Sequence, residues 1–144
     1  MPGDSTLAAV LHVVAAAVLH DQRLLIVSKQ AAPDVFYLPG GKPDPGEAEV
    51  ETLTRELTEE LGVQPVEPVP YLVVEAQAAL EKVPMRLSIY RCSLSLPPVR
   101  AAEIAFVGWT DGADEYVPRL ASAIGGVLAP QLKQDGLLRA GEYS

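Results

Sequence analysis

Residues 47–61 constrain the fold more than any other segment of the chain. They contain no glycine or proline and are rich in helix-forming residues, and Gly62 follows them as a stop signal. The preceding residues 39–46 are dominated by glycine and proline, so irregular structure is expected there. The sequence therefore predicts a helix that follows an irregular loop and buries one apolar stripe, whose members recur at helical spacing: Val50, Leu53, Leu57 and Leu61.

Strand patterns lie on both sides of this helix. Apolar, partly β-branched runs at residues 10–19 and 23–28 flank a short turn and predict an antiparallel pair of strands. Residues 31–39 carry two prolines and are predicted to be a loop. Further strands are expected at residues 71–76, 85–94 and 104–110, and a second helix at residues 119–128, ending near Pro130.

This order of elements predicts a mixed α/β (α+β) fold, with strands before and after a central helix and another helix at the end. A chain of 144 residues leaves little room for a second core, so residues 1–144 are expected to form a single domain.

Composition excludes several classes of function. The net charge of −8 argues against non-specific binding to a nucleic acid polymer, which requires a basic surface. Cys92 is the only cysteine, so neither an internal disulfide nor a cysteine-based zinc site is possible within the chain. The apolar residues 7–19 are too short to span a membrane and follow no basic residue. We therefore expect no membrane association and a cytoplasmic location.

Three glutamates share one edge of the predicted helix. At about 100° per residue, Glu56, Glu59 and Glu60 span an arc of roughly 100° beside the apolar stripe. They are expected on the wet edge of the helix, where they repel one another and a bound Mg²⁺ or Mn²⁺ would offset the repulsion. Arg55, four residues from both Glu51 and Glu59, can orient such a carboxylate. The alternative is an ordinary solvated glutamate face.

The spacing of the whole segment resembles the Nudix box at every fixed position. Gly41 is followed after five residues by Glu47, and after seven more by residues 55–63, Arg-Glu-Leu-Thr-Glu-Glu-Leu-Gly-Val. Residues 36–41 and 24–27 resemble the lead-in and upstream strand of the same family. The resemblance implies an αβα sandwich with a central mixed β-sheet and Mg²⁺-dependent cleavage of a diphosphate linkage in a nucleotide.

The resemblance also implies roles for individual residues. Arg55 fixes the glutamates, and Glu59 is the first candidate for the general base. Glu103 is a candidate base outside the box, or else an ordinary exposed glutamate at the start of a strand. The expected metal ligands are Glu56, Glu59 and Glu60, with Glu47 and the carbonyls of Gly40 and Gly41 as auxiliary groups.

The substrate is indicated by weaker features. Gly-Gly-Lys resembles the MutT-type nucleoside triphosphate pyrophosphatases, in which Lys42 would hold a phosphate; a solvated loop lysine is the alternative. Tyr37 is a candidate for stacking on the base, or a core residue. Arg86 is a candidate for phosphate binding, or lies on the wet side of a strand. The absence of asparagine weakens a preference for oxidised guanine, which this amide often reads.

The implied reaction converts a nucleoside or deoxynucleoside triphosphate to the monophosphate and pyrophosphate. Residues 77–81 lack the proline or tyrosine that often marks enzymes acting on ADP-ribose or dinucleoside polyphosphates, which remain the alternative substrates. A catalytically silent nucleotide-binding module is a third interpretation. A homodimer is possible, because dimers are frequent in the family.

Overall fold

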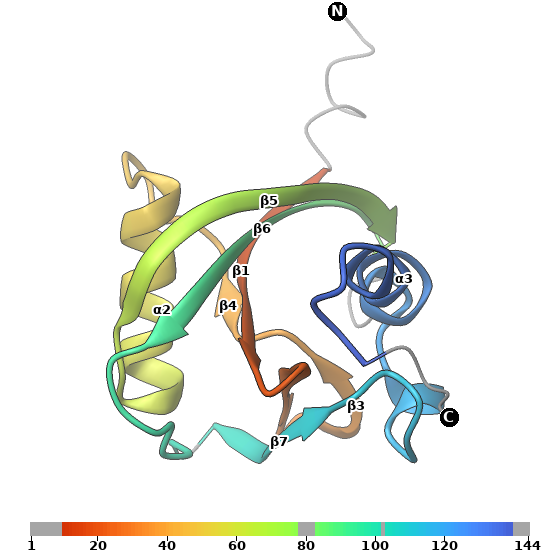
Figure 1. The fold of residues 1–144 in the computed structure, drawn as a ribbon. Helices are drawn as coiled ribbons and strands as arrows, with labels where there is room; N and C mark the ends of the chain where they lie inside the picture. Colours follow the sequence, from red (N-terminus) through yellow and green to blue (C-terminus); the bar gives the residue numbers. More distant parts are fainter. Residues whose placement is uncertain (1–9, 78–82, 102, 140–144) are drawn as a thin grey trace, which may run out of the picture.

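The computed structural model describes residues 10–77, 83–101 and 103–139. Its central sheet lies between α2 on one side and the C-terminal helical segment on the other (Figure 1). The elements in chain order are β1 (Leu11–His20), β2 (Arg23–Lys29), β3 (Ala32–Tyr37), β4 (Gly40–Gly41), α2 (Glu49–Leu61), β5 (Pro65–Gln77), β6 (Pro84–Leu94), β7 (Ile104–Thr110), η1 (Val117–Arg119), η2 (Ile124–Leu128) and α3 (Ala129–Gln134).

The sheet is mixed, as predicted. Its main order is β3-β2-β1-β6-β5, with β4 paired to β1 and β7 paired to β2. Strands β1 and β6 run parallel, whereas the other pairs are antiparallel. β1 pairs with β4 through Val14 and Ala15, and with β2 only at its far end. The short strand β4 is thereby held against the middle of β1.

Both faces of the central strands are buried, which explains their continuous apolar runs. On one face, the fully buried Leu53, Leu57 and Leu61 of α2 pack against alternate residues of β1 and β2. On the other face, Leu128 and Leu132 of the C-terminal helical segment belong to a second core. The expected αβα sandwich is therefore confirmed. The predicted apolar stripe on α2 is shorter than expected, because Val50 is 42% exposed.

Two predicted loops contain strands. The segment predicted as a loop at residues 31–39 includes β3, whose Tyr37 and Ala32 pair with β2. Pro33 is compatible with this pairing because β3 lies at the edge of the sheet, where a missing N–H is tolerated. Gly40 and Gly41 also form β4, although residues 39–46 were expected to be irregular. Both local predictions were wrong because pairing with neighbouring strands outweighed the turn-forming composition.

The second helical segment begins and ends later than predicted. Val117–Arg119 is a separate short 3-10 turn, while helical structure runs through η2 and α3 to Gln134. Pro130 does not end it: this proline directly follows the π-helical turn η2, where the regular hydrogen-bond pattern of the helix is already interrupted. The preceding η2 is a π-helical turn, closed by a hydrogen bond from the Ala129 N–H to the Ile124 carbonyl.

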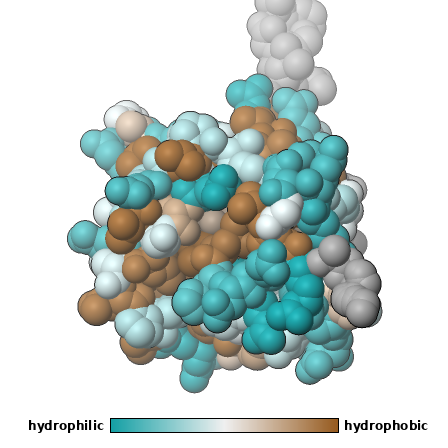
Figure 2. Space-filling view, in the orientation of Figure 1, coloured by the Kyte–Doolittle hydropathy of each residue, from teal (hydrophilic) through white to brown (hydrophobic). Residues whose placement is uncertain are grey.

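Apolar side chains also reach the surface. In the view of Figure 2, they gather across the centre and lower left of the face. Leu96 and Val99, in the connection between β6 and β7, are 65% and 70% exposed. Among the described residues, no helix is long and apolar enough to cross a membrane.

Candidate active site

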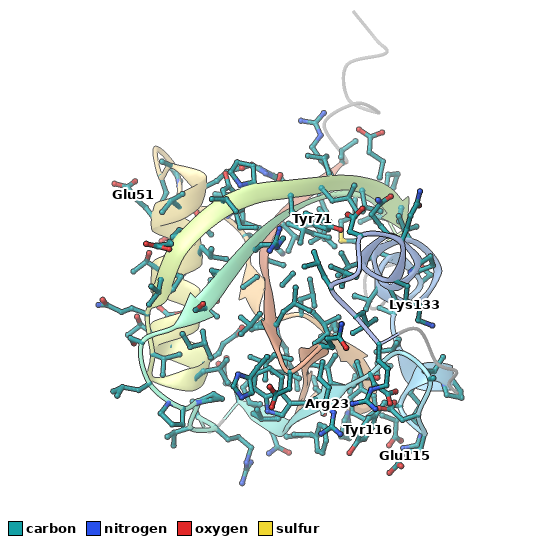
Figure 3. The ribbon with its side chains drawn as sticks, viewed as in Figure 1. Arg23, Glu51, Tyr71, Glu115, Tyr116 and Lys133 are labelled. Carbon is teal, nitrogen blue, oxygen red and sulfur yellow. The ribbon has the colours of Figure 1, made fainter. Side chains whose placement is uncertain are left out.

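The helix α2 is defined by local contacts at both ends. Before its start, the Asp44 N–H donates to Glu47 Oε1 at 2.9 Å, and the Ala48 N–H donates to Glu51 Oε1 at the same distance. Glu51 itself points outward, away from the sheet (Figure 3). Gly62 ends the helix with φ 68°, a left-handed conformation that favours glycine. Between these ends, Glu56, Glu59 and Glu60 share one edge of the helix.

The double glycine of β4 lies against that edge. The Gly40 N–H donates to Glu60 Oε1 at 3.2 Å. A Cβ atom on Gly41 would come within 2.3 Å of Glu56 Oε2, and one on Gly40 within 2.1 Å of the Val14 carbonyl oxygen. At Gly40 the obstacle is backbone, so only glycine permits this close approach of β4 to β1; at Gly41 a larger residue would displace the Glu56 carboxylate.

Burial changes the acid–base properties of two of the three glutamates. Glu60 is only 6% exposed, and burial raises its pKa from 4.5 to about 7. Burial also raises the pKa of Glu56, although the Arg55 guanidinium opposes this shift. The side chain of Glu59 is 59% exposed. The expectation that all three lie on a wet helix edge was therefore wrong for Glu60, which faces inward because it contacts β4.

Arg55 connects the acidic groups. Its Nε and Nη2 donate to the two carboxylate oxygens of Glu47, each at 2.9 Å, and its Nη1 donates to Glu56 Oε2 at 3.0 Å. Nη2 also donates to the Lys42 carbonyl at 3.0 Å, whereas Glu59 lies farther away at 3.7 Å. The bond from Arg55 is the main reason that the pKa of Glu47 falls to about 2. Arg55 thus holds the loop, Glu47 and Glu56 in one arrangement.

These groups line a cavity of about 480 Å³ that is charged at one end and apolar at the other. The charged end is formed by Lys29, Lys42, Asp44, Arg55, Glu56, Glu59, Glu60 and Glu103. The apolar end is formed by Leu11, Val13, Ala15, Leu38, Met85, Leu87, Ala121, Ala123 and Ile124. A cavity of this kind suits a ligand with one charged and one apolar part.

Lys29 is a site residue that the sequence interpretation missed. It ends β2, beyond a register shift. Its positive charge partly offsets the rise in pKa that burial causes at Glu56 and Glu60. Its Nζ lies 5.9 Å from the centre of the Tyr37 ring. In the sequence, Lys29 is only a lone lysine at the end of an apolar run, which is too ordinary a feature to indicate a site residue.

The structure gathers most of the predicted site residues. Tyr37, Lys42 and Glu103 all line the cavity together with Glu56, Glu59 and Glu60. Glu47 does not line it and is bonded to Arg55. Arg86 does not: it lies 3.6 Å from Glu75, and its neighbours Met85 and Leu87 are the β6 residues that line the cavity. Residues 78–81, which carry most of the argument against ADP-ribose and dinucleoside polyphosphates, lie outside the described residues.

The chemistry of the donor set fits a hard divalent cation. Carboxylate and carbonyl oxygens are the ligands that Mg²⁺ prefers, and a nearby cation would oppose the rise in pKa that burial causes at Glu56 and Glu60. Within the described part of the chain, no three potential metal-ligating side chains converge on one point. Glu56 is bonded to Arg55 instead, so a metal-bound arrangement requires side-chain rotation.

Comparisons with known proteins identify the family of the chain. The model of the NUDIX domain family matches residues 10–111. The chain is similar to a MutT NUDIX hydrolase from Burkholderia pseudomallei, with 25% identity and a TM-score of 0.62 over 77% of this chain and 86% of that one. No curated protein matches the chain.

Two further solved structures share the fold. A NUDIX hydrolase from Nitrosomonas europaea is 16% identical, with a TM-score of 0.72 over 94% of this chain and 97% of that one. A UDP-X diphosphatase is 20% identical, with a TM-score of 0.68 over 88% of this chain and 64% of that one. With the family model spanning β1 to β7, these matches establish that the chain belongs to the Nudix hydrolase family and is similar to its MutT-type members.

Proposed function

We propose that the protein hydrolyses a nucleoside or deoxynucleoside triphosphate to the monophosphate and pyrophosphate, with Mg²⁺ as its cofactor and Mn²⁺ as a possible substitute. Nudix hydrolases act on small nucleotide substrates and generally use a divalent metal ion. The observation that carries the proposal is the cavity, whose charged end contains the box glutamates and two lysines. Its apolar end offers a surface for the base.

The proposed metal ligands are Glu56, Glu59 and Glu60, with Glu47 and the carbonyls of Gly40 and Gly41 as auxiliary groups. When bound, Mg²⁺ supplies charge that stabilises phosphoryl oxygens and acidifies water. The partly buried Glu56 and buried Glu60 support this assignment, because each gains a counter-charge when a cation is present.

The reaction joins a water oxygen to a phosphorus atom and breaks a bridging P–O bond, so that pyrophosphate departs and the water loses a proton. Glu59 is the proposed acceptor of that proton, and its exposed carboxylate at the edge of the cavity supports the role. Glu103 also lines the cavity and is the alternative base.

The remaining lining residues have proposed roles in substrate binding. Lys42 and Lys29 bind phosphate oxygens at the charged end, while Tyr37 packs against the nucleoside. Arg86 is not included, because it does not line the cavity. A cytoplasmic location, a single domain over residues 1–144 and a possible homodimer remain predictions.

The second candidate is hydrolysis of another nucleoside diphosphate derivative, including ADP-ribose and dinucleoside polyphosphates. The similarity to a UDP-X diphosphatase over 88% of this chain favours keeping it. A catalytically silent nucleotide-binding module is less well supported, since all three box glutamates and Arg55 are present.

A substrate panel distinguishes these candidates. The purified protein is incubated with Mg²⁺ and ordinary or oxidised nucleoside triphosphates, UDP-sugars, ADP-ribose and diadenosine polyphosphates, and the products are separated by chromatography. Release of monophosphate and pyrophosphate from a triphosphate supports the first candidate. Cleavage restricted to the diphosphate derivatives supports the second, and nucleotide binding without turnover supports the silent module.

A further inference from the structure

Glu49, in the first turn of α2, does not line the cavity, yet three side chains from the sheet bind its carboxylate. Tyr90 Oη donates to Oε1 at 2.7 Å, and Ser88 Oγ donates to Oε2 at 2.9 Å. His12 Nε2 also lies 2.9 Å from Oε2, and it must carry the hydrogen because an ionised carboxylate only accepts.

The three donors come from two adjacent strands. His12 belongs to β1, whereas Ser88 and Tyr90 belong to β6, and these strands run parallel side by side. The carboxylate of Glu49 therefore joins the beginning of α2 to both strands. Its side chain is 34% exposed, so water has limited access to these bonds.

Apolar packing does not hold this end of the helix. Val50 is 42% exposed, and the first fully buried apolar residue of α2 is Leu53. The other end is held by Leu57 and Leu61, which are completely buried. Thr52 is also buried, but its hydroxyl donates to Glu47 and to the Ala48 carbonyl, not to the sheet. Among the described residues, the side-chain hydrogen bonds of Glu49 therefore join the first turn of α2 to the sheet.

This link bears on the box glutamates through the geometry of the helix. Glu49 and Glu56 are separated by seven residues, so they lie within about 20° of each other around the helix axis. Glu56 lies against Gly41, and Gly41 pairs with Val14 of β1, two residues from His12. The bond between Glu49 and His12 thus ties the helix to the strand that also carries β4.

We propose that Glu49 is a positioning residue: it sets the position of α2 relative to β4, and thereby the geometry of the metal-binding carboxylates. The inference rests on the metal site of the proposed function and extends it to a residue outside the cavity. It touches neither substrate nor metal, and it acts through the placement of Glu56. A misplacement of about 1 Å at such a site costs up to a hundredfold in rate.

The test measures Mn²⁺ affinity by titration calorimetry, together with hydrogen exchange of the Thr52 amide in the metal-free protein, because the Thr52 N–H closes the first turn of α2 by donating to the Ala48 carbonyl. The variants are Glu49→Ala, Glu49→Gln and the double change Ser88→Ala with Tyr90→Phe. In Glu49→Ala we expect Mn²⁺ affinity to fall about 10–100-fold, the usual effect of removing an orienting partner. Exchange of the Thr52 amide should accelerate, and kcat should fall more than KM changes. Glu49→Gln should restore part of the affinity by retaining an acceptor oxygen.

Leu132→Ala is the matched control for a general loss of stability. Leu132 is fully buried in α3, on the side of the sheet opposite α2, and its truncation should leave Mn²⁺ affinity within about twofold of the parent protein's. An equal loss of Mn²⁺ affinity in this control would overturn the inference. Unchanged Mn²⁺ affinity and unchanged hydrogen exchange in Glu49→Ala would also overturn the inference. If Glu49→Ala fails to fold, the same two measurements on the double variant decide in its place.

Failure of the proposed function would be recognised separately. The affinity and exchange measurements need no substrate, so they remain decisive even if the parent protein binds Mn²⁺ and hydrolyses none of the nucleoside triphosphates.

Discussion

Glu60→Gln should stabilise the metal-free protein at neutral and alkaline pH, even though it removes a proposed metal ligand. The Glu60 carboxyl is 6% exposed, and its burial disfavours the charged form. Glutamine is neutral, of similar size, and retains an oxygen that can accept the Gly40 N–H now bonded at 3.2 Å. The substitution therefore removes a buried charge without creating a cavity.

The size and sign of this effect follow from the pKa of Glu60. Its folded-state pKa of about 7 lies above the ordinary value of 4.5, so the folded protein binds this proton more tightly than the unfolded chain. The contribution to stability is complete below about pH 4.5 and is lost as pH rises through about 7. The shift corresponds to about 3 kcal/mol, an order-of-magnitude figure, at 1.36 kcal/mol per pKa unit.

Urea unfolding in the presence of a chelator measures the effect. Between pH 5 and pH 8, the free energy of unfolding of the parent protein should fall relative to that of Glu60→Gln, by up to about 3 kcal/mol. Glu59→Gln is the matched control, since the side chain of Glu59 is 59% exposed and its replacement should leave this pH dependence in place. Parallel pH profiles for the parent protein and Glu60→Gln would refute the argument from burial.

Three further perturbations test the site. Glu59→Gln should lower turnover at least about a hundredfold with little change in thermal stability, as assayed by pyrophosphate release and calorimetry; normal turnover would remove Glu59 from the mechanism. Arg55→Ala should weaken Mn²⁺ binding about 10–100-fold in a titration, because Glu47 and Glu56 lose their common partner; unchanged affinity would contradict its orienting role. Gly40→Ala should reduce stability by at least about 1–3 kcal/mol in urea unfolding, since its Cβ would lie 2.1 Å from a backbone oxygen at φ 154°; parent-like stability would contradict the close packing of β4 against β1.

The central helix and its chemistry were largely predictable, because both depend on short sequence separations. The spacing of Leu53, Leu57 and Leu61 determines a buried stripe, and the same periodicity places Glu56, Glu59 and Glu60 on one edge. The apolar runs indicated most of the strands, whereas the mixed sheet was implied by the resemblance to the family. The bounds of the C-terminal helical segment could not be predicted from the sequence. They depend on the π-helical turn and on the accommodation of Pro130 within the helical segment, and both are matters of local geometry.

Features that depend on distant residues required the structure. Glu60 and Glu59 are adjacent and identical in type, yet only Glu60 contacts β4 and becomes buried. Lys29 reaches the glutamates because β2 ends beside them, and Arg86 is separated from the cavity because alternate residues of β6 face opposite sides. Periodicity along the chain shows which residues share a face but not what packs against that face.

Spacing within one segment was sufficient to predict the helix, its carboxylate edge and the resemblance to a Nudix hydrolase. Tertiary contacts were needed for the raised pKa of Glu60, the cavity with charged and apolar ends, and the attachment of Glu49 to β1 and β6. These features differ from the first set because burial and hydrogen bonding depend on which strands lie beside the helix. Packing of α2 on the sheet brings together residues that are far apart in the chain. Glu49 is bonded to His12, Ser88 and Tyr90, from which it is separated by 37, 39 and 41 positions.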